Sequence, residues 1–240
     1  MVYLILAAGT GSRLHPITLK HPKTLFSLDS RTTILKRMVS LIQKLDPQGE
    51  IVVICGFQHR LLQESVSGVT WICNPFYEVT NSIASLWFAR EYLSKEVTIL
   101  NGDIVMSEQL LREIVTVPTS RPVVLMDSSV TNGDYNVQAD EDQVIVMSKQ
   151  LTSYTGEYAG VTKLDPSSAA LLRDQIAEMV DDGRYTTWYE DALVQMIFER
   201  NFRLFTCDIS RYEWTEVDSV DDLMFARRIH EKENRNTSQN

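Results

Sequence analysis

The residues best suited to chemistry lie near the start of the chain, where two glycines follow an apolar run. Small residues after a strand let backbone N–H groups approach a phosphate closely. Two common phosphate loops are excluded, because the dinucleotide fingerprint needs a glycine at Leu14 and the P-loop needs Gly-Lys at Leu14-His15. Arg13, and Lys23 ten residues later, add positive charge to the segment. The predicted ligand-binding residues of this segment are Leu6, Ala7, Ala8, Gly9, Thr10 and Gly11, and the backbone N–H groups of the last four would meet the phosphate.

Other catalytic groupings are not recognisable. None of the four histidines accompanies a nucleophile motif or forms a metal-binding pair; they are His15, His21, His59 and His230. The three cysteines, Cys55, Cys73 and Cys207, have neither CxxC nor zinc-site spacing. We therefore expect buried free thiols in a reducing, cytoplasmic compartment.

The segment 6–25 reads LAAGTGSRLHPITLKHPKTL. It resembles LAAGxGxRLxPxTxxxPKxL, the signature of nucleotidyltransferases of the sugar-nucleotide and choline-phosphate cytidylyltransferase type. The similarity covers almost the whole chain and is closest to the choline-phosphate and phosphonate cytidylyltransferase branch. Further matches are VICGF at 53–57, NSIASL at 81–86, Gly102-Asp103, and EVDSV at 216–220. The resemblance implies a three-layer α/β/α fold with a mixed, mainly parallel sheet, the glycosyltransferase-A-like fold of nucleotide-diphospho-sugar transferases.

The resemblance also implies a reaction, in which an acceptor phosphate attacks the α-phosphorus of a nucleoside triphosphate and pyrophosphate leaves. Arg13 would hold the pyrophosphate, and Lys23 would bridge the α-phosphate and the incoming phosphate. Asp103, beside the nucleotide, and Asp218 would be ligands of Mg²⁺, a cation suited to carboxylates. The attacking group is already an anion, so positioning and electrostatics would supply most of the catalysis. Asp218 could instead cap the last helix, with Ser219 as the rival cap.

The nucleotide base would meet Asn81 and Ser85, because this stretch resembles the cytosine-binding region of the choline-phosphate branch. An asparagine amide can both donate to and accept from a pyrimidine edge. Asn81 also suits a helix N-cap, and both roles are compatible. The sequence favours CTP, with UTP or dTTP as the rival.

The acceptor site would lie in the second half of the chain, where the resemblance implies Tyr135, Tyr189, Asp191 and Glu216. Aromatic faces with nearby carboxylates suit an ammonium group. The sequence departs from the branch at Thr186, where an acid is usual, and at Glu190, where an aromatic is usual. Phosphocholine, aminoethylphosphonate and an amino-acid-derived phosphate all remain compatible as acceptors.

The elements that must position these residues follow from hydrophobic periodicity. Strands expected at 2–6, 51–55, 69–73 and 97–100 alternate with helices, which predicts a parallel sheet covered on both faces. After residue 115 the expected strands are short and suggest an antiparallel extension. We expect a single domain over 1–232, with a nucleotide-binding half at 1–115, an acceptor-binding half at 116–232, and a disordered tail at 233–240. The last three helices are expected at 166–181, 188–200 and 220–232.

Charge narrows the class of partner. The 240 residues include 23 Lys and Arg and 32 Asp and Glu, a net charge of −9, which disfavours binding to nucleic acid or an anionic membrane. No apolar run approaches the roughly 20 residues of a membrane span. Residues 1–45 carry seven basic residues and one acidic residue, whereas the remainder has a net charge of −15. This split suggests an N-terminal segment that handles an anion and a remainder that supplies metal or cation sites.

Two alternatives stay open. One is a uridylyl- or thymidylyltransferase that acts on a sugar 1-phosphate. The other is a nucleotide-sensing regulatory subunit, which the intact set Arg13, Lys23, Asp103 and Asp218 disfavours. Whether the chain forms a homodimer is left open by the sequence.

Overall fold

The computed structural model of the chain describes residues 1–237. Its strands are β1 Val2–Ala7, β2 Glu50–Cys55, β3 Thr70–Cys73, β4 Val97–Asn101, β5 Ile104–Met106, β6 Val123–Asp127, β7 Asn136–Asp140, β8 Gln143–Ser148, β9 Gly156–Leu164, β10 Phe205–Asp208 and β11 Trp214–Glu216. Its α-helices are α1 Ile34–Leu45, α2 His59–Ser65, α3 Ser82–Phe88, α4 Glu108–Leu110, α5 Pro166–Asp181, α6 Tyr189–Arg200 and α7 Val220–Thr237. Shorter turns are η1 Ser12–Leu14, η2 Ile17–Leu19, η3 Lys23–Leu25, η4 Arg90–Tyr92 and the π-helical η5 Leu111–Val115.

Nine strands form one mixed sheet in the order β3-β2-β1-β4-β9-β6-β10-β8-β7. The first four are parallel, as their alternation with helices predicts, because a crossover helix returns the chain to the same end of the sheet. Strand β9 then runs antiparallel to both β4 and β6. "Mainly parallel" therefore describes the N-terminal half, whereas most pairings beyond β4 are antiparallel.

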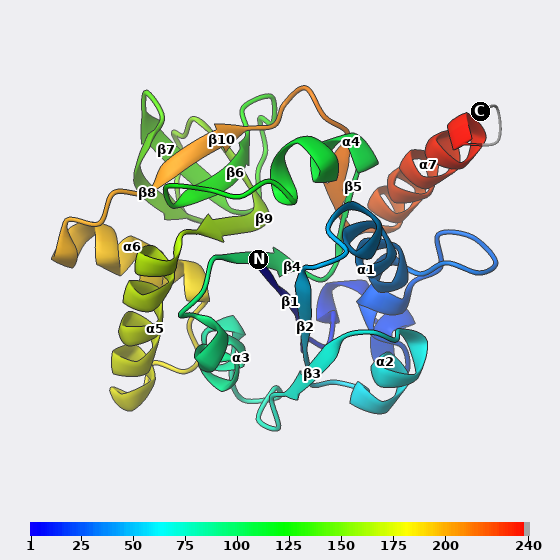
Figure 1. Ribbon diagram of the computed structural model, residues 1–240, viewed down its shortest axis with the longest axis horizontal. Helices are drawn as coiled ribbons and strands as arrows, with labels where there is room; N and C mark the ends of the chain where they lie inside the picture. The colour runs from blue at the N-terminus through cyan, green and yellow to red at the C-terminus, as the bar shows by residue number, and fades with distance from the viewer. Residues whose placement is uncertain (238–240) are drawn as a thin grey trace.

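Helices cover both faces of the sheet, which confirms the three layers. The apolar side chains of α3, α5 and α6 pack on one face, against alternate residues such as Leu4 and Val52. Those of α1 and α2 pack on the other face, against the intervening residues such as Ile5 and Val53. Figure 1 shows these two groups of helices on opposite sides of β1 and β2. The alternation follows from the two-residue period of a strand.

A separate small sheet pairs β5 with β11 in antiparallel fashion. Helix α7 lies beside it and closes a third apolar cluster, which includes Ala226 and Ile229. The expected helix end at residue 232 is wrong, because α7 continues through Thr237, and Arg37 forms an ion pair with Glu233. The predicted disorder is thus incorrect for 233–237, and residues 238–240 lie outside the described part of the chain.

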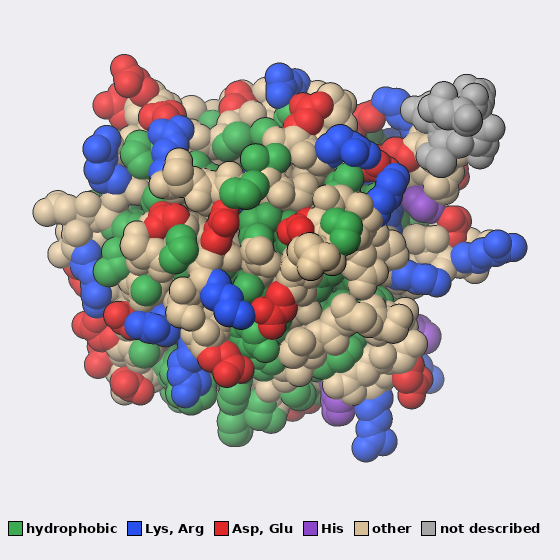
Figure 2. Space-filling model, viewed as in Figure 1, with side chains coloured by type: hydrophobic (Ala, Val, Ile, Leu, Met, Phe, Trp, Pro, Cys, Tyr) green, Lys and Arg blue, Asp and Glu red, His purple; other side chains and the backbone are tan. Residues whose placement is uncertain are grey.

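Charged side chains of both signs are interspersed on the face seen in Figure 2, without a broad basic patch. Several are paired across elements, including Lys44 with Glu108 and Lys95 with Glu50. Within residues 1–237, no helix is both long enough and apolar enough to cross a bilayer.

Candidate active site

A pocket of about 390 Å³ opens at the carboxyl ends of the parallel strands. Its wall brings together segments that are far apart in the sequence. The predicted residues among its lining are Leu6, Ala7, Ala8, Gly9, Thr10, Gly11, Arg13, Lys23, Asn81, Ser85, Asp103, Glu216 and Asp218. Ligands of open α/β sheets typically bind at this edge, because the loops that follow the strands meet there.

The glycine loop at 9–11 continues directly from β1. Gly11 has φ +64°, a left-handed conformation that favours glycine, and its carbonyl accepts a hydrogen bond of 2.7 Å from Thr18 Oγ1. A Cβ at Gly9 would meet no protein atom within 4 Å. Protein packing therefore does not demand glycine at this position, and the open space beside Gly9 suits a ligand that approaches the backbone.

Three carboxylates are brought together by the pairing of β5 with β11. Asp103 follows β4, and Gly102 N–H donates to Leu6 O at 2.8 Å, which holds Asp103 beside the glycine loop. Ile104 pairs with Glu216 in the small sheet, and Val217 N–H donates to Asp103 O at 3.1 Å. One ligand oxygen from each of Asp103, Glu216 and Asp218 lies within 4.8 Å of the others.

Lys23 bridges two of these acids. Its Nζ lies 2.6 Å from Asp103 Oδ2 and 2.6 Å from Asp218 Oδ1. Burial lowers the pKa of Lys23, but the carboxylates of Asp103 and Asp218 outweigh burial, so its pKa is raised and the ammonium stays charged. Turn η3, which starts at Lys23, delivers this ammonium from the Pro-Lys end of the motif.

The acid cluster fits a hard divalent cation. Asp103 Oδ1 is buried and has no hydrogen-bond partner. Burial, reinforced by Asp103 and Asp218, raises the pKa of Glu216 well above its ordinary value. Lys23 pairs with Asp103 and Asp218, and the unpaired Oδ1 of Asp103 is available as a ligand. Glu216, expected to contact the acceptor, lies within this cluster.

Arg13 reaches across the mouth of the pocket. Its guanidinium pairs with Asp218 and, at 2.8 Å, with Asp134. Burial lowers the pKa of Arg13, but Asp218 and Asp134 raise it by more. Of the two candidate caps of α7, Ser219 fills the role, because its Oγ accepts the hydrogen bond from Asp222 N–H at 3.2 Å. Asp218 is therefore free to face Lys23 and Arg13.

The side of the pocket that was expected to meet the nucleotide base contains polar side chains that form hydrogen bonds with their neighbours. Asn81 lines the pocket and also begins α3, accepting from Ser82 N–H at 2.8 Å. Ser85 is buried, and its Oγ accepts from Asn74 Nδ2 at 3.1 Å. Asn74, which was not predicted as a site residue, also donates to Thr80 Oγ1 at 3.1 Å. Both expected roles of Asn81, helix cap and pocket wall, are therefore compatible with its position.

Three of the expected acceptor residues, Tyr135, Tyr189 and Asp191, are not among the residues that line this pocket. Tyr189 is fully buried, and its hydroxyl bonds to Tyr158 at 2.5 Å and Thr162 at 3.0 Å. Asp191 accepts from Trp188 N–H at 3.1 Å and caps α6. The reason is the phase of α6, which turns Tyr189 toward the core together with Leu193.

Trp188 and Glu190 line the pocket in their place. Glu190 Oε2 and the Tyr135 hydroxyl are both buried without a hydrogen-bond partner. Burial raises the pKa of Glu190 to about 8, with a further contribution from Asp191. Burial and then Glu190 raise the pKa of Tyr135, so these two groups are close neighbours. The departure from the family pattern at Glu190 is the sequence signal that could have identified it.

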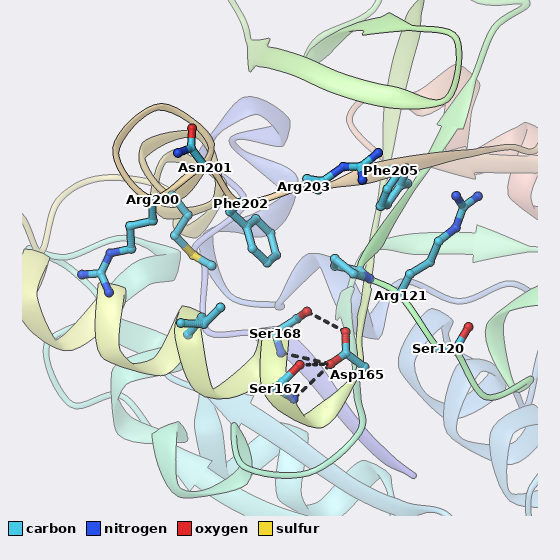
Figure 3. Close-up of a pocket in the computed structure, with 13 residues that line it drawn as sticks. Ser120, Arg121, Asp165, Ser167, Ser168, Arg200, Asn201, Phe202, Arg203 and Phe205 are labelled. Atoms are coloured by element: carbon cyan, nitrogen blue, oxygen red, sulfur yellow. Dashed lines mark hydrogen bonds between the residues drawn. The ribbon is translucent and has the colours of Figure 1, made fainter.

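A second hollow, of about 430 Å³, lies between the start of α5 and the end of α6 (Figure 3). Its charged groups have partners within the chain. Asp165 caps α5 through Ser167 and Ser168, as the dashed lines in Figure 3 show. Arg121 pairs with Asp142, and Arg200 pairs with Glu178. None of the predicted site residues lines this hollow.

Two known proteins are similar to the chain over most of its length. The chain is 27% identical to a choline-phosphate cytidylyltransferase of Streptococcus pneumoniae, covering 98% of this chain and the whole of that protein. It is 26% identical to a CMP-5'-(3-aminopropyl)phosphonate synthase of Streptomyces rubellomurinus, covering 91% of this chain but only 37% of that protein. The chain thus spans little more than a third of the length of that relative.

The fold has solved counterparts. The structure of a CTP:phosphocholine cytidylyltransferase from Streptococcus pneumoniae matches with a TM-score of 0.76 at 22% identity, covering 95% of this chain and 98% of that chain. This likeness supports the nucleotide-diphospho-sugar transferase fold. Residues 3–179 match the family model described as the MobA-like NTP transferase domain, which covers the glycine loop, Lys23 and Asp103. The chain therefore belongs to the MobA-like NTP transferase family and is a nucleotidyltransferase.

Proposed function

We propose that the chain is a Mg²⁺-dependent cytidylyltransferase, which transfers CMP from CTP to a small phosphate or phosphonate acceptor that carries an ammonium group. The observation that carries this proposal is the cluster of Asp103, Glu216 and Asp218 around Lys23, at the edge of the glycine loop. The cytidylyltransferases among its relatives support CTP as the nucleotide.

The chain's own residues would act mainly by position and charge. The loop backbone at 9–11 and Arg13 would hold the triphosphate, with Arg13 exchanging its present carboxylate partners for phosphate oxygens. Lys23 would lie between the α-phosphate and the acceptor phosphate, lowering the repulsion between two anions. Asp103 and Asp218, with Glu216 beside them, would hold Mg²⁺. When bound, that ion shields phosphate charge and stabilises the departing pyrophosphate.

Trp188 and Glu190 form the part of the pocket lining that we call the acceptor wall. Its chemistry supports an acceptor that carries an ammonium group. Trp188 offers an aromatic face, and Glu190 offers a buried carboxyl oxygen that lacks a partner. A cation beside Glu190 would favour its ionised form and release the proton that the carboxyl group holds in the free protein. We therefore expect acceptor binding near pH 7 to release a proton, which calorimetry in buffers of different ionisation enthalpy would measure.

The nucleotide is tested by a thermal-shift screen of CTP, UTP, GTP, ATP and dTTP, each with and without Mg²⁺. Selective binding raises the melting temperature by mass action. We expect CTP with Mg²⁺ to give the largest shift, and EDTA to remove most of it. A preference for UTP or dTTP would instead support the uridylyl- or thymidylyltransferase alternative.

The reaction is tested by pyrophosphate release with phosphocholine, 2-aminoethylphosphonate and glucose 1-phosphate as acceptors. We expect turnover with an ammonium-bearing acceptor and little with the sugar phosphate. Lys23→Ala should lower kcat by roughly 10²–10³-fold, because it removes a charge aimed at the reacting phosphates. Lys20→Ala, an exposed lysine in the same segment, is the matched control and should retain activity. CTP binding without pyrophosphate release from any acceptor would favour the regulatory-subunit alternative.

A further inference from the structure

Two of the three cysteines face each other across neighbouring strands. In the parallel pairing of β2 with β3, Cys55 is directly opposite Cys73. Neighbouring strands lie about 4.8 Å apart, and disulfides join Cα atoms that are about 4.4–6.8 Å apart. The backbone spacing is therefore compatible with a bond between these two residues.

The two thiols also point to the same side of the sheet. Cys55, Val53 and Trp71 all belong to the cluster under α1 and α2. Because side chains alternate along a strand, Cys73, two residues after Trp71, faces the same way. The expectation of buried thiols is correct for Cys55 but wrong for Cys73, which is exposed at the end of the edge strand β3.

Oxidation would therefore begin at Cys73. It is the accessible thiol of the pair, whereas burial raises the pKa of Cys55 to about 12 and keeps it protonated. Thiolate character and exposure determine which cysteine reacts first with an oxidant. Cys207 lies on β10, at the opposite side of β1 and β4 in the sheet order, and serves as an internal control.

Each of the two cysteines is followed directly by a residue that contacts the segments around the nucleotide pocket. Asn74, which follows Cys73, lines the pocket and donates its backbone N–H to Cys55 O at 2.8 Å. Gly56, which follows Cys55, packs so tightly that a Cβ there would lie 2.8 Å from Ala8 O in the phosphate-binding segment. A change in the spacing of Cys55 and Cys73 would thus displace residues on two walls of the pocket.

We propose that Cys55 and Cys73 form a redox-active dithiol, whose reversible disulfide weakens nucleotide binding. Hydrogen peroxide would oxidise the Cys73 sulfur to a sulfenic acid, with its O–O bond broken and one molecule of water released. The Cys55 sulfur would then attack the Cys73 sulfur, forming the S–S bond while the hydroxyl leaves as water with the Cys55 proton. The disulfide would be reduced again by a small dithiol.

The covalent step is tested without any nucleotide. The full chain is treated with hydrogen peroxide, its remaining thiols are alkylated, and tryptic peptides are analysed by mass spectrometry. We expect the peptides 45–60 and 61–90 to be joined after cleavage at Arg60, with the link lost on dithiothreitol treatment and Cys207 still alkylated. Overoxidation of Cys73 while Cys55 stays reduced, or a link from Cys73 to Cys207 or to a second chain, would overturn the proposal.

The functional step compares CTP–Mg²⁺ affinity in reduced and oxidised protein. We expect the dissociation constant to rise about tenfold on oxidation, because a small displacement of a binding wall has a large effect. Cys73→Ser, at an exposed position, should abolish the change, and Cys207→Ser should preserve it. Formation of the disulfide with an unchanged affinity for CTP–Mg²⁺ would overturn the proposal that the disulfide weakens nucleotide binding. Failure of every nucleotide to bind the reduced protein would instead count against the proposed function, while the peptide link would stand.

Discussion

At the scale of single residues, Glu190 combines a buried carboxyl group with an incomplete set of hydrogen bonds. Its carboxyl is buried on the acceptor wall, and Oε2 has no hydrogen-bond partner. Burial raises its pKa from 4.5 to about 8; Asp191 adds to this effect, while Lys149 opposes it. The neutral titratable groups nearby include Tyr135, Tyr158 and Tyr189. An acid that is held neutral beside a binding pocket is typical of a functional site.

We predict that Glu190→Gln stabilises the free protein at neutral pH. The unfolded carboxyl loses its proton near pH 4.5, whereas the folded one keeps it to about pH 8, so stability falls as the pH rises between these values. The neutral amide avoids this loss, which amounts to on the order of 3 kcal/mol near pH 7. Urea unfolding of both proteins from pH 4.5 to 8 should show stability curves that coincide at low pH and diverge above it.

Glu199→Gln is the matched control for that substitution. Glu199 lies on the same helix, α6, but is exposed, so its removal should leave the pH dependence unchanged. Parallel curves for wild type and Glu190→Gln would show that the Glu190 carboxyl titrates normally. Under the proposed function, Glu190→Gln should also raise KM for an ammonium-bearing acceptor more than KM for CTP.

A site residue could be predicted from the sequence where the residues that position it lie close to it in the chain. The motif at 6–25 places Arg13 and Lys23 within one short segment, and both line the pocket as predicted. The acceptor wall could not be predicted in the same way. The side chain of Tyr189 is held by Tyr158 and Thr162, which lie on β9, so its burial depends on a tertiary contact with a distant strand. No local pattern specifies that contact.

At the scale of elements, α7 controls the position of the Asp218 carboxylate. Asp222 accepts from the backbone N–H groups of Asp218 at 3.1 Å and Ser219 at 2.7 Å. The reciprocal bond from Asp222 N–H to Ser219 Oγ completes a capping box. The start of this helix thus sets the course of the segment that carries Asp218.

We predict that Asp222→Ala lowers kcat by about tenfold with little change in secondary structure, because the Asp218 segment loses its anchor. The cap itself stabilises by about 1 kcal/mol. Asp221→Ala removes the same charge from the same helical turn at an exposed position, and it should remain active. Pyrophosphate release and circular dichroism on both variants test this. Equal loss of activity in the two variants would assign the effect to charge rather than to the cap.

The arrangement of strands was only partly predictable. Regular alternation of strand and helix predicted that β1 to β4 are parallel, because each crossover returns the chain to the same edge, but it did not predict their order β3-β2-β1-β4. Beyond β4, the antiparallel β9 is inserted between β4 and β6, although it follows both in the sequence. Short strands with similar composition contain no local signal for such partners. The same applies to the end of α7, where the pairing of Glu233 with Arg37 extends a helix through a polar segment.

At the scale of the whole molecule, the opposing charges of the two halves meet at the mouth of the pocket. Arg13, from the N-terminal half, pairs with Asp134 at 2.8 Å, and Lys149 pairs with the same carboxylate at 2.8 Å. Lys149 Nζ also lies 4.7 Å from the centre of the Trp188 ring. This chain of contacts, which we call the clasp, joins the glycine loop to the acceptor wall. The net charge of −9 is thus compatible with a local cationic site for phosphate.

Under the proposed function, the clasp makes Asp134 a competitor of the triphosphate for Arg13. In the free protein, its carboxylate pairs with Arg13, which lines the pocket, and with Lys149. We predict that Asp134→Asn lowers the dissociation constant for CTP–Mg²⁺ by several-fold, because removal of a negative charge frees Arg13 for phosphate oxygens. The stability of the free protein should change by less than about 1 kcal/mol, because both partners are about half exposed.

The size of that gain should depend on salt, because contacts between exposed charges are screened within about 8 Å at physiological ionic strength. Calorimetric titrations with CTP–Mg²⁺ at low and high salt would therefore show a larger difference between wild type and Asp134→Asn at low salt. Asp142→Asn, which releases Arg121 beside the second hollow, removes the same charge far from the active site and separates a local effect from one of net charge. Weaker nucleotide binding by Asp134→Asn would contradict the role of Asp134 as a competitor. It would mean that Asp134 holds Arg13 in the orientation that the triphosphate requires.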